Sequence, residues 1–111
     1  MKAMRTPALR DRDLALLRQV FQAFPCVREV RLFGSRATGN ARRASDIDLA
    51  ISAPEATPRE WFDLTGAIEE LPIVYEFDVV RMETLQNQQL MEKIAREGLP
   101  IYTLSLYAGV K

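Results

Sequence analysis

Residues 46–52 form the segment that most limits how this chain can fold. Polar or small residues alternate there with large apolar ones, a period of two that is typical of a strand and does not form the apolar stripe of a helix. Asp46 and Asp48 therefore lie on one face of the expected strand. The other face, which we expect to be buried, carries the side chains of Ile47, Leu49 and Ile51.

Three other segments have strand character. Residues 27–33 and 73–80 alternate in the same way, and residues 101–104 are expected to add a short edge strand. In the second of these segments, Glu76 and Asp78 share one face, while the aromatic residues share the other. A second strand with a carboxylate on its polar face is therefore predicted.

Three segments carry apolar residues at helical spacing, namely residues 14–24, 57–71 and 83–97. A proline follows the first of them. The second opens with Thr57-Pro58-Arg59-Glu60, in which Thr and Glu are placed to form a capping box and Pro suits the first turn. The third ends at Gly98, a residue type that commonly terminates helices.

These elements predict one α/β (α+β) domain over residues 1–111, in which a small mixed β-sheet has helices packed on one face. The length and the 48% of hydrophobic residues suit a single core. Cys26 is the only cysteine, so we expect a small buried residue in a reducing compartment. No apolar stretch suits a signal peptide or a membrane span, and we therefore expect a cytoplasmic protein without a membrane partner.

The charge composition limits the chemistry. Fifteen basic and fifteen acidic residues give a formal net charge of zero, so we expect no direct nucleic-acid binding, and any phosphate site must be local. The chain has no histidine, which excludes histidine acid–base catalysis, Ser-His triads and histidine-ligated zinc. Carboxylates are then the obvious reactive groups.

Three carboxylates are candidates for a shared site. Asp46 and Asp48 leave the same face of one strand, where like charges raise each other's pKa. Asp78 lies on the corresponding face of another strand, so the three converge if the two strands are neighbours. Oxygen ligands without His or Cys suit Mg²⁺ or Mn²⁺, with water and substrate phosphates in the remaining positions.

A candidate phosphate site follows the first predicted strand. Gly34 lets backbone N–H groups approach an anion closely, and Ser35 adds a hydroxyl group. Arg36 adds a cation that could meet a triphosphate, and Arg42 and Arg43 could reinforce it. Together with the carboxylates, these residues are the equipment for phosphoryl or nucleotidyl transfer.

Each feature also has a simpler interpretation. An Asp-x-Asp pair is often only the solvated face of a sheet, and Gly-Ser is more often a turn than a phosphate site. Asp78 and Glu76 could be surface ion-pair partners, and Arg42 and Arg43 could lie in a solvated loop. The order and combination of the features are much rarer than the features themselves, and this favours a catalytic site.

The combination resembles the nucleotidyltransferase superfamily of DNA polymerase β, and specifically its minimal, MNT-type branch. Residues 32–37 (LFGSRA) resemble the Gly-Ser motif of that family, and residues 45–50 (SDIDLA) its Asp-x-Asp motif. Residues 77–80 (FDVV) supply the third carboxylate. The resemblance extends from the first helix to residues 98–102 and covers nearly the whole chain.

The resemblance implies a role for each site residue. Asp46 and Asp48 would hold Mg²⁺ and, through it, the triphosphate of ATP. Asp78 would complete the metal site and help to deprotonate the acceptor hydroxyl group. The pair Gly34-Ser35 would bind the β- and γ-phosphates, with Arg36 as a helper.

The resemblance also implies a partner. Larger relatives carry an added domain that presents the acceptor, whereas this chain ends soon after the core, so the acceptor is expected on another molecule. Minimal members resemble the antitoxin of a toxin–antitoxin pair whose toxin is a HEPN-type ribonuclease, and AMP transfer from ATP to a toxin tyrosine is the leading hypothesis.

Two alternatives remain beside this hypothesis. The first is a non-catalytic antitoxin that neutralises the HEPN protein by occlusion. The second is nucleotidylation of a small molecule such as an aminoglycoside, which would need a pocket between the subunits of a homo-oligomer.

Overall fold

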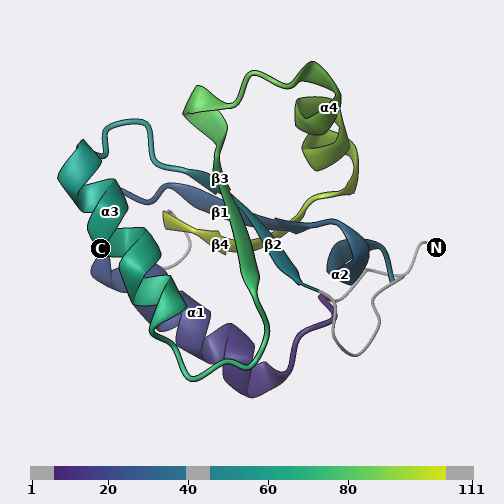
Figure 1. The fold of residues 1–111 in the computed structure, drawn as a ribbon. Coiled ribbons are helices and arrows are strands. Elements are labelled where there is room, and N and C mark those ends of the chain that lie inside the picture. Colours follow the sequence, from purple (N-terminus) through teal and green to yellow (C-terminus); the bar gives the residue numbers. More distant parts are fainter. Residues whose placement is uncertain (1–6, 40–45, 105–111) are drawn as a thin grey trace.

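A four-stranded sheet with the strand order β3-β2-β1-β4 lies at the centre of the protein (Figure 1). The computed structural model describes residues 7–39 and 46–104. Its elements, in chain order, are α1 (Asp11–Ala23), β1 (Glu29–Phe33), α2 (Ser35–Thr38), β2 (Ile47–Ser52), α3 (Pro58–Glu69), β3 (Phe77–Arg81), the 3-10 helix η1 (Met82–Thr84), α4 (Gln88–Glu97) and β4 (Leu99–Thr103).

The sheet is mixed, as predicted. Strand β1 pairs antiparallel with both β2 and β4, while β2 pairs parallel with β3. The residue opposite Asp48 is Phe33 on one side and Asp78 on the other. This register places the end of β1 and the starts of β2 and β3 at the same end of the sheet, and the polar residues that we expected to form a site lie there.

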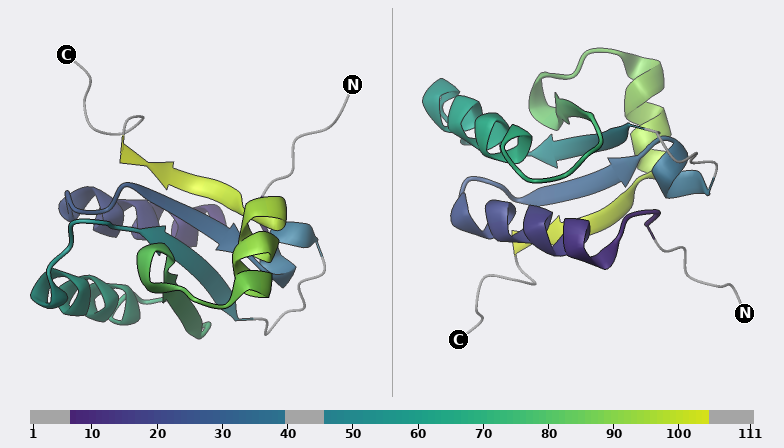
Figure 2. Two further views of the ribbon diagram at one scale, coloured as in Figure 1. Left: turned by 90° about the horizontal axis from the view of Figure 1, so that it is seen from above. Right: turned by 60° about the horizontal axis from the view of Figure 1, so that its bottom comes forward.

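Helices α1 and α3 cover one face of the sheet (Figures 1 and 2). Leu17 and Phe21 of α1 and Leu64 and Ile68 of α3 are fully buried in one core cluster. The strand residues in this cluster include those predicted to be buried in β2. The strand residues of the cluster are Val30, Leu32, Ile47, Leu49, Ile51, Ile101 and Tyr102.

The other face differs from the prediction because it also carries a helix. Ile94 of α4 packs there against Phe33 and Ala50, with Leu90 beside it. The strand residues that point to this face are therefore not all polar. The apolar ones, such as Phe33 and Ala50, are covered by the apolar side of α4. The carboxylates occupy the part of this face at the start of β2 and β3.

Strand β3 is shorter than the sequence predicts. It begins at Phe77 and not at Ile73, although residues 73–80 alternate throughout. The reason is pairing, since β2 begins at Ile47, the partner of Phe77, and offers no strand residue to the segment before it. The predicted faces are nevertheless correct, because Ile73, Tyr75, Phe77 and Val79 all pack against the main core.

The predicted helix over residues 83–97 is divided. Its first part is the 3-10 helix η1, and α4 begins only at Gln88. The side chain of Asn87 accepts a hydrogen bond from the backbone N–H of Leu90 at 3.0 Å, which caps the new helix. The final strand is present at the sheet edge, at residues 99–103.

Helix α3 starts as predicted. The hydroxyl oxygen of Thr57 accepts a hydrogen bond from the N–H of Glu60, and the Glu60 carboxylate accepts one from the N–H of Thr57, which completes the capping box with Pro58 in the first turn. Among the helices of the described residues, none combines the length and the apolar character needed to cross a bilayer.

We expect Gly66→Ala to raise the free energy of unfolding by about 0.5–1 kcal/mol, because alanine loses less backbone entropy than glycine in a helix. Gly66 lies within α3, and no described atom outside the backbone of that helix lies within 4 Å of a Cβ built there. Urea denaturation measures the change. A decrease in stability would mean that this helix is not formed in solution as described.

Candidate active site

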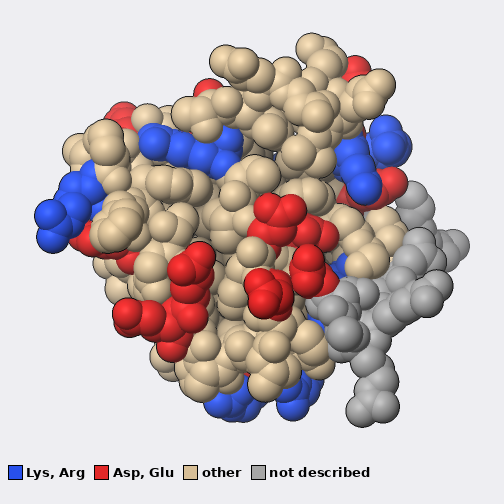
Figure 3. Space-filling view, in the orientation of Figure 1, with Lys and Arg blue, Asp and Glu red and all other residues tan. Residues whose placement is uncertain are grey.

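Two of the predicted carboxylates are direct neighbours in the sheet. Asp48 of β2 and Asp78 of β3 are register partners on parallel strands, which lie about 4.8 Å apart in such a pair. Asp46 comes directly before β2 and is exposed. Figure 3 shows a group of acidic side chains over this end of β2 and β3. The structure thus places Asp48 and Asp78 side by side, with Asp46 at the start of β2.

Gly34 follows β1 and lies against the Asp48 side chain. Its backbone has a φ of 76° and a ψ of −154°, a conformation that is essentially restricted to glycine. A Cβ atom at this position would overlap Oδ2 of Asp48 and would lie 3.2 Å from its Cγ. The glycine therefore allows the backbone of the Gly-Ser turn to approach the carboxylate closely.

The carboxylates of the site influence one another's ionisation. Burial raises the pKa of Asp48 above its ordinary value of 3.8, and the charges of Asp78 and Asp46 raise it further. Lys93 and Arg36 partly oppose this effect. The predicted repulsion between the carboxylates is therefore present, and a cation at this place would relieve it.

The donor set fits a hard divalent cation that is completed by substrate. Within the described residues, no three His, Cys, Asp or Glu side chains are grouped closely enough to hold a metal by themselves. Mg²⁺ is commonly bound by one or two carboxylates together with substrate phosphates and water, and the adjacent pair Asp48 and Asp78 can provide this. The involvement of Asp46 as a third ligand stays a prediction.

Arg36 is more buried than its predicted role suggests. The residue is only 6% exposed, and its guanidinium carbon lies 4.3 Å from the centroid of the Tyr75 ring. Nη1 donates to the carbonyl oxygen of Ala8 at 2.7 Å, and Nε donates to that of Asp46 at 3.3 Å. These contacts fix the backbone at Asp46, while binding of a phosphate by Arg36 stays a prediction.

A pocket of about 350 Å³ lies between α2 and α4, beside the Gly-Ser turn. Its lining consists of Gly34, Ser35, Thr38, Lys93 and Glu97. Sequence reasoning singled out the first two of these and missed the others. Lys93 reads in the sequence as an ordinary lysine on the exposed side of an amphipathic helix, so only the packing of α4 onto the sheet places it near the site.

The remaining predicted cations and carboxylates are less informative. Arg42 and Arg43 lie outside the described residues. Glu76 is exposed, and its backbone carbonyl accepts a hydrogen bond from the N–H of Ile47 at 2.8 Å.

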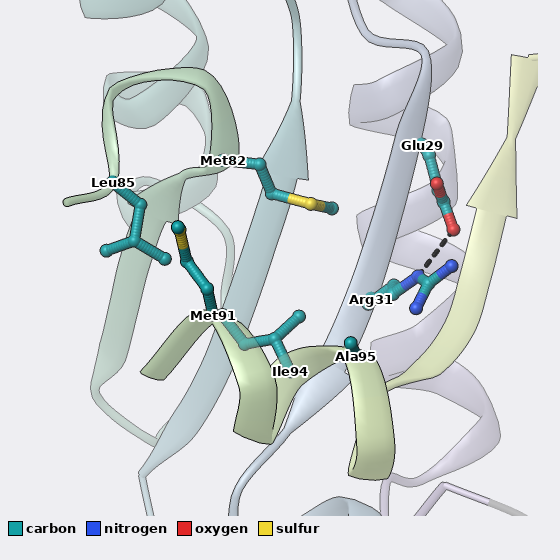
Figure 4. A pocket seen from close by; sticks show the side chains of 7 residues that line it. All are labelled: Glu29, Arg31, Met82, Leu85, Met91, Ile94 and Ala95. Carbon is teal, nitrogen blue, oxygen red and sulfur yellow. Dashed lines mark hydrogen bonds and ion pairs between the residues drawn. The ribbon is translucent and has the colours of Figure 1, made fainter. Parts of the chain in front are cut away.

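A second pocket, of about 270 Å³, lies on the other flank of α4 (Figure 4). Met82, Leu85 and Met91 line it on one side. An ion pair between Arg31 Nε and Glu29 Oε2, 2.6 Å apart, lies on the other. Residues 93 and 97 face the opposite flank of the helix from residues 91 and 95, so this pocket is separate from the one at the Gly-Ser turn.

The family model described as "Polymerase beta, Nucleotidyltransferase" matches residues 16–105. No curated protein matches the sequence.

Three solved structures are informative. A minimal nucleotidyltransferase has 31% sequence identity over 80% of this chain and 88% of its own, with a TM-score of 0.53. A chain in the structure of the tri-AMPylated Shewanella oneidensis HEPN toxin in complex with MNT antitoxin has 16% sequence identity. The match covers 88% of this chain and 76% of that chain, with a TM-score of 0.62. A toxin–antitoxin complex with AMP-PNP has 21% identity, covers 86% and 74%, and has a TM-score of 0.60.

The two complexes are below 25% identity and support the fold alone. The family match covers most of the chain and includes the Gly-Ser turn and all three carboxylates. The chain therefore belongs to the polymerase β nucleotidyltransferase family.

Proposed function

We propose that this protein transfers AMP from ATP, with Mg²⁺, to a hydroxyl group of a protein acceptor. The observation that carries the proposal is the pairing of Asp48 with Asp78 beside Gly34. It joins a place for a divalent cation to a glycine turn whose backbone N–H groups can approach phosphate oxygens. Such a pair of sites suits a triphosphate that is attacked at its α-phosphorus.

The transfer follows from these positions. The acceptor oxygen forms a bond to the α-phosphorus, the bond from that phosphorus to the bridging β-oxygen breaks, and pyrophosphate leaves. The acceptor proton passes to a carboxylate, and we assign this role to Asp78, which is exposed. Gly34 and Ser35 hold the leaving pyrophosphate. A bound Mg²⁺ would neutralise charge on the phosphates and lower the pKa of the acceptor hydroxyl group.

We further propose that the acceptor is a tyrosine of a HEPN-type toxin and that the protein acts as its antitoxin. The support is a likeness in fold to the MNT antitoxin in complex with a tri-AMPylated HEPN toxin and to a toxin–antitoxin complex with AMP-PNP. Modification of a tyrosine would add a bulky anionic group to the toxin and would be a direct way to silence a ribonuclease.

Incubation with ATP labelled at the α-phosphorus tests the proposal. The wild-type protein, with Mg²⁺ and the product of its neighbouring gene, is expected to transfer label to that partner. ATP labelled at the γ-phosphorus is expected to transfer none, which separates AMP transfer from phosphorylation. The variant Asp46→Asn, Asp48→Asn is the matched control and should transfer no label, because it keeps the size of both side chains but removes their charge.

The competing function is neutralisation by occlusion. If no label moves from α-labelled ATP while the wild-type protein and the double variant block the partner's ribonuclease activity equally, the catalytic proposal is wrong. The protein would then be a binding antitoxin on a nucleotidyltransferase fold. Label on a small hydroxyl compound and none on the partner would also contradict the proposed acceptor.

A further inference from the structure

The pocket beside the Gly-Ser turn is built from two elements that are far apart in the sequence. Gly34, Ser35 and Thr38 contribute one wall, and α4 contributes Lys93 and Glu97. With about 350 Å³ of space next to a glycine turn, it has room for the phosphates of a nucleotide. A phosphate chain carries several negative charges, so the source of positive charge in this pocket matters.

Arg36 is poorly placed to supply that charge. It is buried, and it donates hydrogen bonds to the carbonyl oxygens of Ala8 and Asp46 while it stacks on Tyr75. A phosphate would have to replace these contacts. Among the described residues that line the pocket, Lys93 is the one with a positive charge, and it is exposed to solvent.

The packing of α4 fixes the position of Lys93. Ile94, the next residue, is 4% exposed and packs on Phe33 and Ala50 of the sheet, which orients the helix. Lys93 and Glu97 are four residues apart and therefore share the flank that faces α2. The charge of Glu97 is offset by Arg96, whose Nη2 lies 3.6 Å from Glu97 Oε2.

Lys93 also lies within electrostatic reach of the carboxylates. Its charge acts on Asp48, where it opposes the rise in the pKa of that side chain. Asp48 in turn lies against Gly34, at the start of the phosphate turn. The lysine therefore lines a pocket whose other wall, at Gly34, contacts a member of the carboxylate pair.

We propose that Lys93 binds the β- and γ-phosphates at the Gly34-Ser35 turn and makes the site selective for nucleoside triphosphates over monophosphates. The inference rests on the proposed function, because it takes ATP as the donor. The flexible stem and three N–H donors of a lysine suit phosphate oxygens of varying position.

Binding of nucleotides by Lys93→Met tests the inference without any partner. Methionine keeps the length of the side chain and its helix propensity but removes the charge. We expect affinity for a non-hydrolysable ATP analogue with Mg²⁺ to fall by about 10- to 100-fold, the usual loss for a hydrogen bond to a charged group, and that for AMP to stay unchanged. Isothermal titration calorimetry measures both ligands.

Two further variants make the result specific. Lys93→Arg keeps the charge and is expected to bind the ATP analogue within a few-fold of the wild type. Arg59→Met removes an exposed cation from α3, on the opposite face of the sheet, and is expected to leave both affinities unchanged. Circular dichroism of all three variants checks that they are folded.

The outcomes separate this inference from the proposed function. The inference is overturned, while AMP transfer stands, if Lys93→Met binds the ATP analogue as tightly as the wild type. It is also overturned if the variant loses as much affinity for AMP as for the analogue. If the wild type binds the analogue but transfers no label, and Lys93→Met loses the analogue alone, the inference stands and the proposed function fails. A wild type that does not bind the analogue overturns both.

Discussion

Replacing Asp48 by Asn is expected to lower the rate of AMP transfer by about 10³-fold while making the metal-free protein more stable. Asp48 is the carboxylate that touches the Gly-Ser turn and pairs with Asp78, so its charge is central to any site for a divalent cation. The charge stabilisation supplied by such a cation is worth several kcal/mol, and about 4 kcal/mol corresponds to about 10³-fold in rate. The transfer of α-labelled ATP measures the rate.

The gain in stability follows from the raised pKa of Asp48. The pKa of this carboxyl group is higher in the folded protein than in the unfolded chain, where it is near 3.8. The contribution of the group to stability is therefore fully present at a pH below the unfolded pKa, and it is lost as the pH rises through the folded pKa. At pH 7 the ionised side chain therefore opposes folding. Asn removes that charge, and because the side chain is partly exposed to solvent, we expect the free energy of unfolding to rise by about 0.2–1 kcal/mol.

The pH dependence distinguishes this cause from simple repacking. Urea denaturation in the presence of a chelator should give the largest difference between the variant and the wild type near pH 7, and a difference close to zero below pH 3.8. A difference that is the same at both pH values would contradict the electrostatic explanation. Mg²⁺ with a nucleotide should stabilise the wild type more than the variant, because only the wild type keeps the charged site.

The part of the site that lies within single strands was predictable from the sequence. The alternation in residues 46–52 fixes which face carries Asp48, and the same holds for Asp78. The alternation does not determine their adjacency, because that depends on whether β2 and β3 are neighbours in the sheet. The family resemblance implied it, and the register of the parallel pair confirms it.

Contacts between distant segments were not predictable in this way. Arg36 follows the glycine turn and reads as a free cation, but Tyr75 and the carbonyl oxygen of Ala8 bury it. Lys93 has no local feature that marks it, and only the packing of Ile94 brings it to the site. Asn87 did carry a signal, since asparagine is a favoured helix cap, but the apolar spacing before it suggested one continuous helix.

Gly34→Ala is expected to have the second large effect, a loss of about 2–6 kcal/mol in the free energy of unfolding together with the loss of AMP transfer. Backbone strain at a φ of 76° and a ψ of −154° accounts for about 1–3 kcal/mol of this. The overlap of the new methyl group with Oδ2 of Asp48 adds about 1–3 kcal/mol, the usual cost of overpacking. Urea denaturation and the label-transfer assay measure the two effects.

Gly39→Ala is the matched control. Gly39 also has a positive φ, of 86°, but no described atom lies within 4 Å of a Cβ built there. It therefore carries the strain of a left-handed residue without the overlap, and we expect a loss of only about 1–2 kcal/mol. A loss at Gly39 as large as that at Gly34 would mean that the contact with Asp48 contributes little.

A double-mutant cycle separates the two parts of the Gly34 effect and keeps the test open if the single variant is poorly folded. Asp48→Ala removes the carboxylate that the new methyl group would meet, so Gly34→Ala should cost about 1–3 kcal/mol less in that background than in the wild type. The strain of the backbone stays the same in both. A coupling close to zero would mean that the glycine is required only for its backbone conformation. A coupling in the expected range would mean that the Gly34-Ser35 turn and the Asp48 carboxylate depend on each other. The absence of a side chain at Gly34 would then be what lets a phosphate chain on the turn and a cation on the carboxylate come within reach of each other.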